Sequence, residues 1–106
     1  MGESRRSADM FPVADWGEAI DRGVGAFCFE WREDGVERYE TLIVIIPTDR
    51  APLGESVMLP LRPAKPSHNP ATWEFDGNRE RPTLSPSVHL PDQWHGFVRA
   101  GRLESC

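Results

Sequence analysis

Side chains that could carry chemistry gather near the end of the sequence: Ser87, His89, Asp92, His95 and Cys106. An imidazole that takes the proton of a hydroxyl or thiol creates a nucleophile, and a carboxylate can fix the tautomer of that imidazole. The sequence therefore allows Ser87 or Cys106 to act as a nucleophile, with His95 or His89 as the base. Asp92 would orient the base. The sequence contains no nucleophile-elbow motif around Ser87 or Cys106, which counts against catalysis. Catalysis is therefore only one of three functional hypotheses.

The same side chains also suggest a zinc site. Zinc takes thiolate and imidazole donors in sets of four, or of three with a water. The sequence supplies Cys28, His95 and Cys106, with His89 or Glu30 as a fourth ligand. Because no close Cys-x-x-Cys or His-x-x-x-His pair is present, these ligands would have to meet through tertiary contacts. Alternatively, Cys28 is a small buried residue and Cys106 is loosely held, in which case no cofactor is needed.

The third hypothesis is a protein-binding surface, because the end of the chain combines aromatic rings with arginines. Trp and Arg are enriched among the residues that contribute most to protein–protein binding. The expected contact residues are Trp94, His95, Phe97, Arg99 and Arg102. The opposing interpretation is that the aromatic rings form the core. The sequence favours a protein partner over catalysis and leaves enzymatic activity uncertain.

The composition narrows the class of partner. The chain has 106 residues, enough for one domain, and a net charge of −5. Nucleic acids and anionic membranes both require a basic face on the protein, so neither is expected as a partner. Two cysteines cannot build the disulfide framework of a small secreted domain, and the longest apolar run is far too short to cross a bilayer. A cytoplasmic protein is expected.

The elements that must position the reactive residues are strands. Residues 94–106 have the pattern of a closing hairpin. A three-residue loop is expected, because a two-residue turn would force Ala100 to a positive φ. The three-residue loop pairs His95 with Ser105. The two-residue turn would instead place His95 opposite Cys106.

The first half of the chain predicts a short helix followed by strands. The helix is expected at residues 14–22 and ends at Gly23 in a left-handed conformation. Residues 27–31 then alternate with a period of two, which is typical of a half-buried strand. The unbroken apolar run at residues 42–46 lacks this alternation and predicts a central strand covered on both faces.

Turn and proline signals divide the remaining sequence. Asp34 and Gly35 predict a hairpin turn. Residues 57–61 predict a short strand at a sheet edge or with a bulge, because Pro60 removes one hydrogen-bond donor from the sheet. Residues 62–70 are expected to form an extended surface loop, and residues 82–87 to cross the surface in extended form.

Together these elements predict a mainly β fold. We expect a small antiparallel sandwich or curled sheet of about six or seven strands, with one short N-terminal helix. Residues 1–10 are expected to be a flexible N-terminus, and residues 11–106 a single β-rich domain.

The last third of the sequence resembles a family of short proteins from bacteriophages, prophages and bacteria. The shared motifs are Trp-x-Phe-x-Gly-Asn at 73–78, Pro-Thr-Leu-Ser-Pro-Ser-Val at 82–88, Trp-His-Gly-Phe-Val at 94–98 and Gly-Arg-Leu at 101–103. That family is catalogued as a domain of unknown function, and some members carry a mistaken ammonia monooxygenase label. The resemblance implies a fold and a phage or prophage setting, but no activity.

Many members of the family also carry a Cys-x-x-Cys pair on the early strand and further Cys and His near the end. This chain keeps only Cys28 of the pair, and Trp94 stands where a Cys often precedes the His. We therefore predict a phage or prophage accessory protein in the cytoplasm of a bacterial host cell. It would act by binding a protein, such as a host or defence protein. The alternative is a small zinc-type domain or a Cys/His-dependent enzyme.

Overall fold

The centre of the fold is strand β4 (Arg38–Ile46), which lies inside a sheet with the order β2–β3–β4–β5. A computed structural model describes residues 3–33, 35, 37–64 and 71–106. The flanking strands are β2 (Phe11–Pro12), β3 (Ala26–Glu33) and β5 (Glu55–Pro60). Every residue from 41 to 48 is buried. This confirms the prediction that the apolar run at 42–46 is a central strand covered on both faces.

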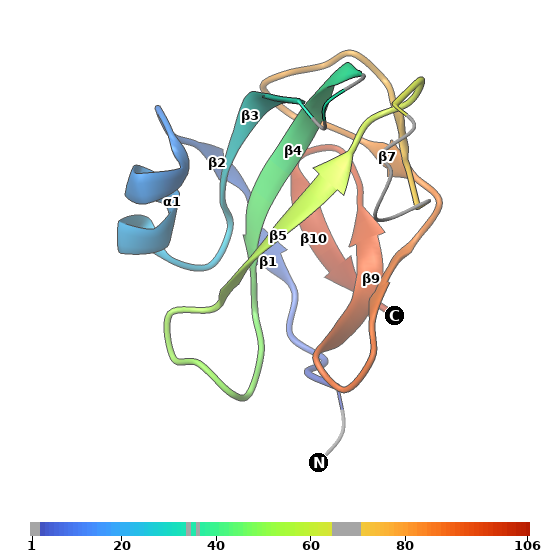
Figure 1. Cartoon of the computed structure of the whole chain (residues 1–106). Helices are drawn as coiled ribbons and strands as arrows, with labels where there is room; N and C mark the ends of the chain where they lie inside the picture. The colour runs from blue at the N-terminus through green and yellow to red at the C-terminus, as the bar shows by residue number, and fades with distance from the viewer. Residues whose placement is uncertain (1–2, 34, 36, 65–70) are drawn as a thin grey trace.

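A second sheet packs against the first, so that the two form a sandwich (Figure 1). Its strands, in spatial order, are β1 (Ala8–Asp9), β10 (Arg102–Ser105), β9 (Trp94–Val98) and β8 (Val88–Leu90). The core between the sheets includes Phe27, Leu42 and Val44 from the first sheet and Val88, Trp94, Val98 and Leu103 from the second. A small extra sheet pairs β6 (Glu74–Phe75) with β7 (Leu84–Ser85). The predicted mainly β class is confirmed.

Helix α1 (Trp16–Arg22) covers the outer face of the β2–β5 sheet, where Ala19 is buried (Figure 1). The side chain of Asp15 caps its start by accepting a hydrogen bond from the Glu18 N–H at 2.9 Å. Gly23 ends it with a φ of 88°, as predicted, because this backbone conformation favours glycine. No helix in the described part of the chain is long and apolar enough to cross a membrane.

Two of the predicted connections fall partly outside the described residues. Asp34 of the expected turn and residues 65–70 of the expected 62–70 loop are not among those that the structure describes. β3 and β4 nevertheless pair antiparallel, as a hairpin requires. β5 lies at the edge of its sheet, as its proline predicts. The extended stretch expected at 82–87 contains the short strand β7.

The N-terminal segment is paired with the second sheet, which differs from the flexible end expected for residues 1–10. β1 pairs with β10, and the Ser4 N–H donates to the Gln93 carbonyl at 2.9 Å. The indole Nε1 of Trp94 donates to the Arg6 carbonyl at 2.9 Å. Trp94 is fully buried and needs an acceptor for this N–H, which the backbone at residue 6 supplies. The hydrogen bond from the buried Trp94 indole therefore helps to hold the N-terminal segment against the second sheet.

Gly96 provides the space that this indole occupies. On β9 the buried residues alternate, so that Trp94, Gly96 and Val98 face the core. A Cβ built on Gly96 would lie 2.5 Å from two ring carbons of Trp94 and 2.3 Å from the Glu104 carbonyl oxygen. A side chain at this position would displace the indole or separate β9 from β10.

The closing hairpin uses a two-residue turn, so the predicted three-residue loop is wrong. Val98 pairs with Leu103, which leaves Ala100 and Gly101 at the tip with φ values of 49° and 74°. Two positive φ angles are characteristic of the turn type whose twist best matches paired strands.

A neighbouring segment offsets the strain at this turn. The N–H of Ala100 donates to the Thr83 hydroxyl at 2.8 Å, and the N–H of Gly101 donates to the Pro82 carbonyl at 3.0 Å. A left-handed alanine costs about 1–2 kcal/mol, and each of these hydrogen bonds returns a comparable amount. The three-residue loop was expected because the sequence shows the cost of a positive φ at Ala100. It does not show that Thr83 and Pro82, on a different segment, accept hydrogen bonds from the turn.

We predict that Gly96→Ala lowers the free energy of unfolding by about 2–3 kcal/mol, because the new methyl group overlaps the Trp94 indole. Urea unfolding followed by tryptophan fluorescence measures this change. The matched control is Gly17→Ala on the exposed side of α1, which should be neutral or stabilise by up to about 1 kcal/mol. An equal effect of both substitutions would contradict the assigned role of Gly96.

Candidate functional site

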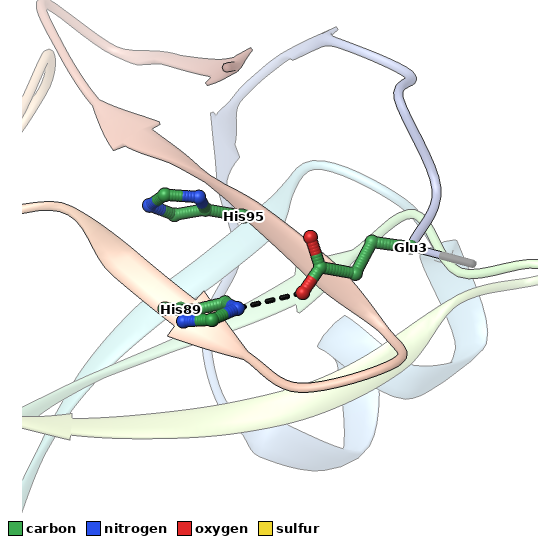
Figure 2. A group of neighbouring side chains, drawn as sticks. All are labelled: Glu3, His89 and His95. Atoms are coloured by element: carbon green, nitrogen blue, oxygen red, sulfur yellow. Dashed lines mark hydrogen bonds and ion pairs between the residues drawn. The ribbon is translucent and has the colours of Figure 1, made fainter.

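The hairpin of β8 and β9 places two histidines directly opposite each other. His89 pairs with His95 in the antiparallel register. Because Trp94 and Gly96 face the core, His95 between them faces outward. The two imidazole rings lie one over the other on the outer face of the second sheet, with centroids 4.5 Å apart and planes at 38° (Figure 2).

Ser87 completes a pair with one of these rings. It lies two residues before His89, and Val88 between them is buried, so Ser87 and His89 share the outer face. The Ser87 Oγ lies 3.3 Å from the His95 Nε2. A hydroxyl at this distance from an imidazole nitrogen can transfer its proton to that nitrogen when the contact shortens. The serine is half-buried, which keeps it accessible to a bound molecule.

A carboxylate from the opposite end of the chain joins the cluster. The Glu3 Oε2 lies 2.6 Å from the His89 Nε2, with the Glu3 side chain reaching in from the N-terminal segment (Figure 2). The hydrogen bonds of Trp94 and Ser4 hold this segment against the sheet. The site is therefore assembled from residues 86 positions apart in sequence.

A cleft opens beside His95. Its volume is about 310 Å³, and it is lined by Glu3, Ser4, Arg5, His95, Ser105 and Cys106. Cys106 lies opposite His95, since its N–H donates to the His95 carbonyl at 3.0 Å. This size is at the lower end of the range for ligand sites in proteins. The cleft can therefore hold a short stretch of a bound chain next to the imidazole.

The family model of BubE, described as a bacterial ubiquitination-like system serine protease, matches residues 51–106. The chain belongs to the BubE family. The match extends from β5 to β10 and includes Ser87, His89 and His95, while Glu3 lies outside it. No curated protein and no solved structure matches the chain.

The BubE match also covers all the motifs at residues 73–103 that carry the family resemblance. Of the candidate catalytic residues predicted from the sequence, the structure brings Ser87 and His95 into contact. Asp92 lies in the β8–β9 turn with a φ of 63°. Among residues 3–33, 35, 37–64 and 71–106, the carboxylate that pairs with an imidazole is that of Glu3. The sequence carried no signal for Glu3, because its segment was expected to be flexible.

The structure does not bring together the three expected zinc ligands, Cys28, His95 and Cys106. Cys28 lies on β3 opposite Ile43, in the first sheet. His95 lies on the outer face of the second sheet, and Cys106 directly follows β10 of that sheet. The group of potential ligands found in the described residues is Glu3, His89 and His95, with ligand atoms within 4.8 Å of one another.

The expected binding surface is only partly exposed. Trp94 is fully buried, so it belongs to the core and cannot touch a partner. His95 lines the cleft. The guanidinium of Arg99 lies 4.5 Å from the Phe97 ring centre and pairs with Glu104 at 3.0 Å.

Arg102, the last residue expected in that surface, pairs with Asp9 of β1 at 2.6 Å. Of the expected set, Arg99 and Arg102 are thus exposed but form ion pairs, while His95 and Phe97 are half-buried. Surface ion pairs of this kind contribute little to stability and can exchange for a partner's charges.

We predict that the two thiols differ sharply in reactivity. Burial raises the pKa of the Cys28 thiol, and the carboxylates of Glu30 and Asp15 add to this rise, so the thiol stays protonated at pH 8. Cys106 is exposed. Ellman's reagent should therefore titrate one thiol rapidly in the native protein and the second only after unfolding. Rapid reaction of both thiols in the native protein would contradict the burial of Cys28. Rapid reaction of the remaining thiol in the Cys106→Ser variant would contradict it as well.

Proposed function

We propose that this chain is a serine protease of a bacterial ubiquitination-like system, with Ser87 as the nucleophile and His95 as the general base. The observation that carries the proposal is the 3.3 Å contact between the Ser87 Oγ and the His95 Nε2. It lies inside the part of the chain that matches a family described as a serine protease. The family description and the contact agree on the type of nucleophile.

The scaffold supports such a role for His95. β9 lies between β10 and β8, so backbone hydrogen bonds on both sides fix the position of His95. In the reaction, His95 takes the proton of the Ser87 hydroxyl as the oxygen attacks a peptide carbonyl, and then returns the proton to the leaving amine. A resting distance of 3.3 Å is long for this transfer, and such contacts shorten when substrate binds.

His89 and Glu3 act as positioning residues in this proposal. The His89 ring packs over the His95 ring and restricts its rotation, while Glu3 holds His89 in turn. A carboxylate that orients a histidine is the usual third member of such a site. Here the carboxylate acts through a second imidazole, and Glu3 takes the part that sequence reasoning assigned to Asp92.

The protein partner expected from the sequence becomes the substrate in this proposal. A protease binds an extended stretch of another protein, and the 310 Å³ cleft beside His95 offers room for one. Phe97 follows His95 on the same face of β9 and extends the surface that the substrate would contact. The phage or prophage setting and the cytoplasmic location remain predictions.

Cys106 is the second candidate nucleophile. It lies across from His95 and lines the same cleft, so a Cys/His site is geometrically accessible. The Ser87 contact and the family description favour the serine. A single labelling experiment distinguishes the two.

A fluorophosphonate probe should label the protein at Ser87, because only an activated serine oxygen displaces the fluoride at a useful rate. We predict that Ser87→Ala abolishes labelling and that His95→Gln slows it about 100-fold or more. Gel fluorescence and peptide mass spectrometry measure the rate and the position. Thermal unfolding checks that each variant is folded.

Ser85→Ala is the matched control for this experiment, since Ser85 lies in the same motif but is an exposed residue of strand β7. It should be labelled like the wild type, and so should Cys106→Ser. Labelling that survives in Ser87→Ala would exclude Ser87 as the nucleophile. Loss of labelling in Cys106→Ser, together with iodoacetamide inactivation, would favour the cysteine.

A further inference from the structure

We infer that Glu3, His89 and His95 form a zinc-binding site whose occupation blocks the general base. The metal-binding part stands on the geometry of these three side chains alone. The inhibitory part rests on the proposed function of Ser87 and His95.

The donor set fits zinc chemistry. One carboxylate and two imidazoles, with water in the fourth position, are a common tetrahedral set for this ion. The ligand atoms of the three residues all lie within 4.8 Å of one another. Zinc bonds of about 2.0–2.2 Å place ligand atoms roughly 3.4 Å apart. The 2.6 Å contact between Glu3 and His89 would open to admit the ion, and the wider separations, which are at most 4.8 Å, would close by no more than about 1.4 Å.

The surroundings allow both the entry of an ion and these small movements. The side chains of His89 and Glu3 are 53% and 33% exposed, so rotation of either costs little. His89 and His95 lie on the outer face of the second sheet, and Glu3 reaches them from the N-terminal segment (Figure 2). Glu3 also lines the cleft beside His95. His95 itself is held by strands on both sides and provides the fixed ligand.

Binding through either nitrogen of His95 disables it as a base. If the ion binds Nε2, it occupies the nitrogen that faces Ser87. If the ion binds Nδ1, the remaining proton of the neutral ring sits on Nε2, which can then donate to Ser87 but cannot accept its proton. Zinc would therefore act as a reversible inhibitor of the Ser87 reaction in either case.

The metal-binding test uses the full chain, purified without a polyhistidine tag and treated with a chelator. Native mass spectrometry after addition of zinc chloride should show about one zinc ion per chain for the wild type. Ser87→Ala should bind zinc equally, because Ser87 is not a ligand. Glu3→Gln and His89→Gln should lose the bound zinc, while Glu80→Gln, which alters an exposed carboxylate elsewhere, should keep it.

Cys106→Ser decides between this site and one built on the nearby thiol. Retained zinc binding by this variant supports the Glu3–His89–His95 set, and loss of zinc would overturn it. Wild-type binding by Glu3→Gln would also overturn it. Circular dichroism establishes that the variants are folded, and if His89→Gln does not fold, Glu3→Gln alone decides.

The inhibitory part is measured by the rate at which the fluorophosphonate labels Ser87 with and without zinc. Zinc should slow labelling of the wild type about tenfold or more, because the base is removed. An unchanged rate with zinc bound would overturn the inhibitory role. If zinc binds but Ser87 is never labelled, the proposed protease function fails while the metal site stands. If Ser87 is labelled but no zinc binds, the metal site fails alone.

Discussion

The hydrogen bond from the buried indole of Trp94 to the Arg6 carbonyl holds the site together. The ring fills the space beside Gly96 between the sheets, and its buried N–H requires a hydrogen-bond acceptor. The N-terminal segment provides that acceptor and is thereby placed against β9. This placement carries Glu3 to His89. The core thus determines where a distant carboxylate lies on the surface.

The strand order explains why the reactive residues converge. Alternation along β9 turns Trp94 inward and His95 outward, so the residue that fills the core and the proposed general base are neighbours. The tight β8–β9 hairpin then aligns His89 and Ser87 with His95. A one-residue change of register would move the imidazole of His95 to the interior.

Local patterns predicted much of this architecture. The apolar run at 42–46 indicated the central strand, and Gly23 marked the end of the helix, because both signals depend on neighbouring residues. Ser87 and His95 were among several candidate catalytic residues, and the structure brings these two within 3.3 Å of each other. The strand and helix predictions succeeded because their physics is confined to one or two adjacent elements.

Long-range contacts explain the features that the sequence did not reveal. Ala100 adopts a positive φ because Thr83 and Pro82 accept hydrogen bonds at the turn, and no local pattern shows those partners. Glu3 lies 86 positions from His89, in a segment that looks too polar to be ordered. Cys28 and Cys106 share the ligand chemistry of zinc but belong to different sheets.

A crystal structure of the protein after reaction with a peptidyl phosphonate tests the central claim most directly. The account predicts phosphorus bonded to the Ser87 Oγ, with the His95 Nε2 within about 2.7–3.2 Å of an oxygen of the adduct. Phosphorus bonded to any other residue, or a His95 ring turned away from the adduct, would contradict it.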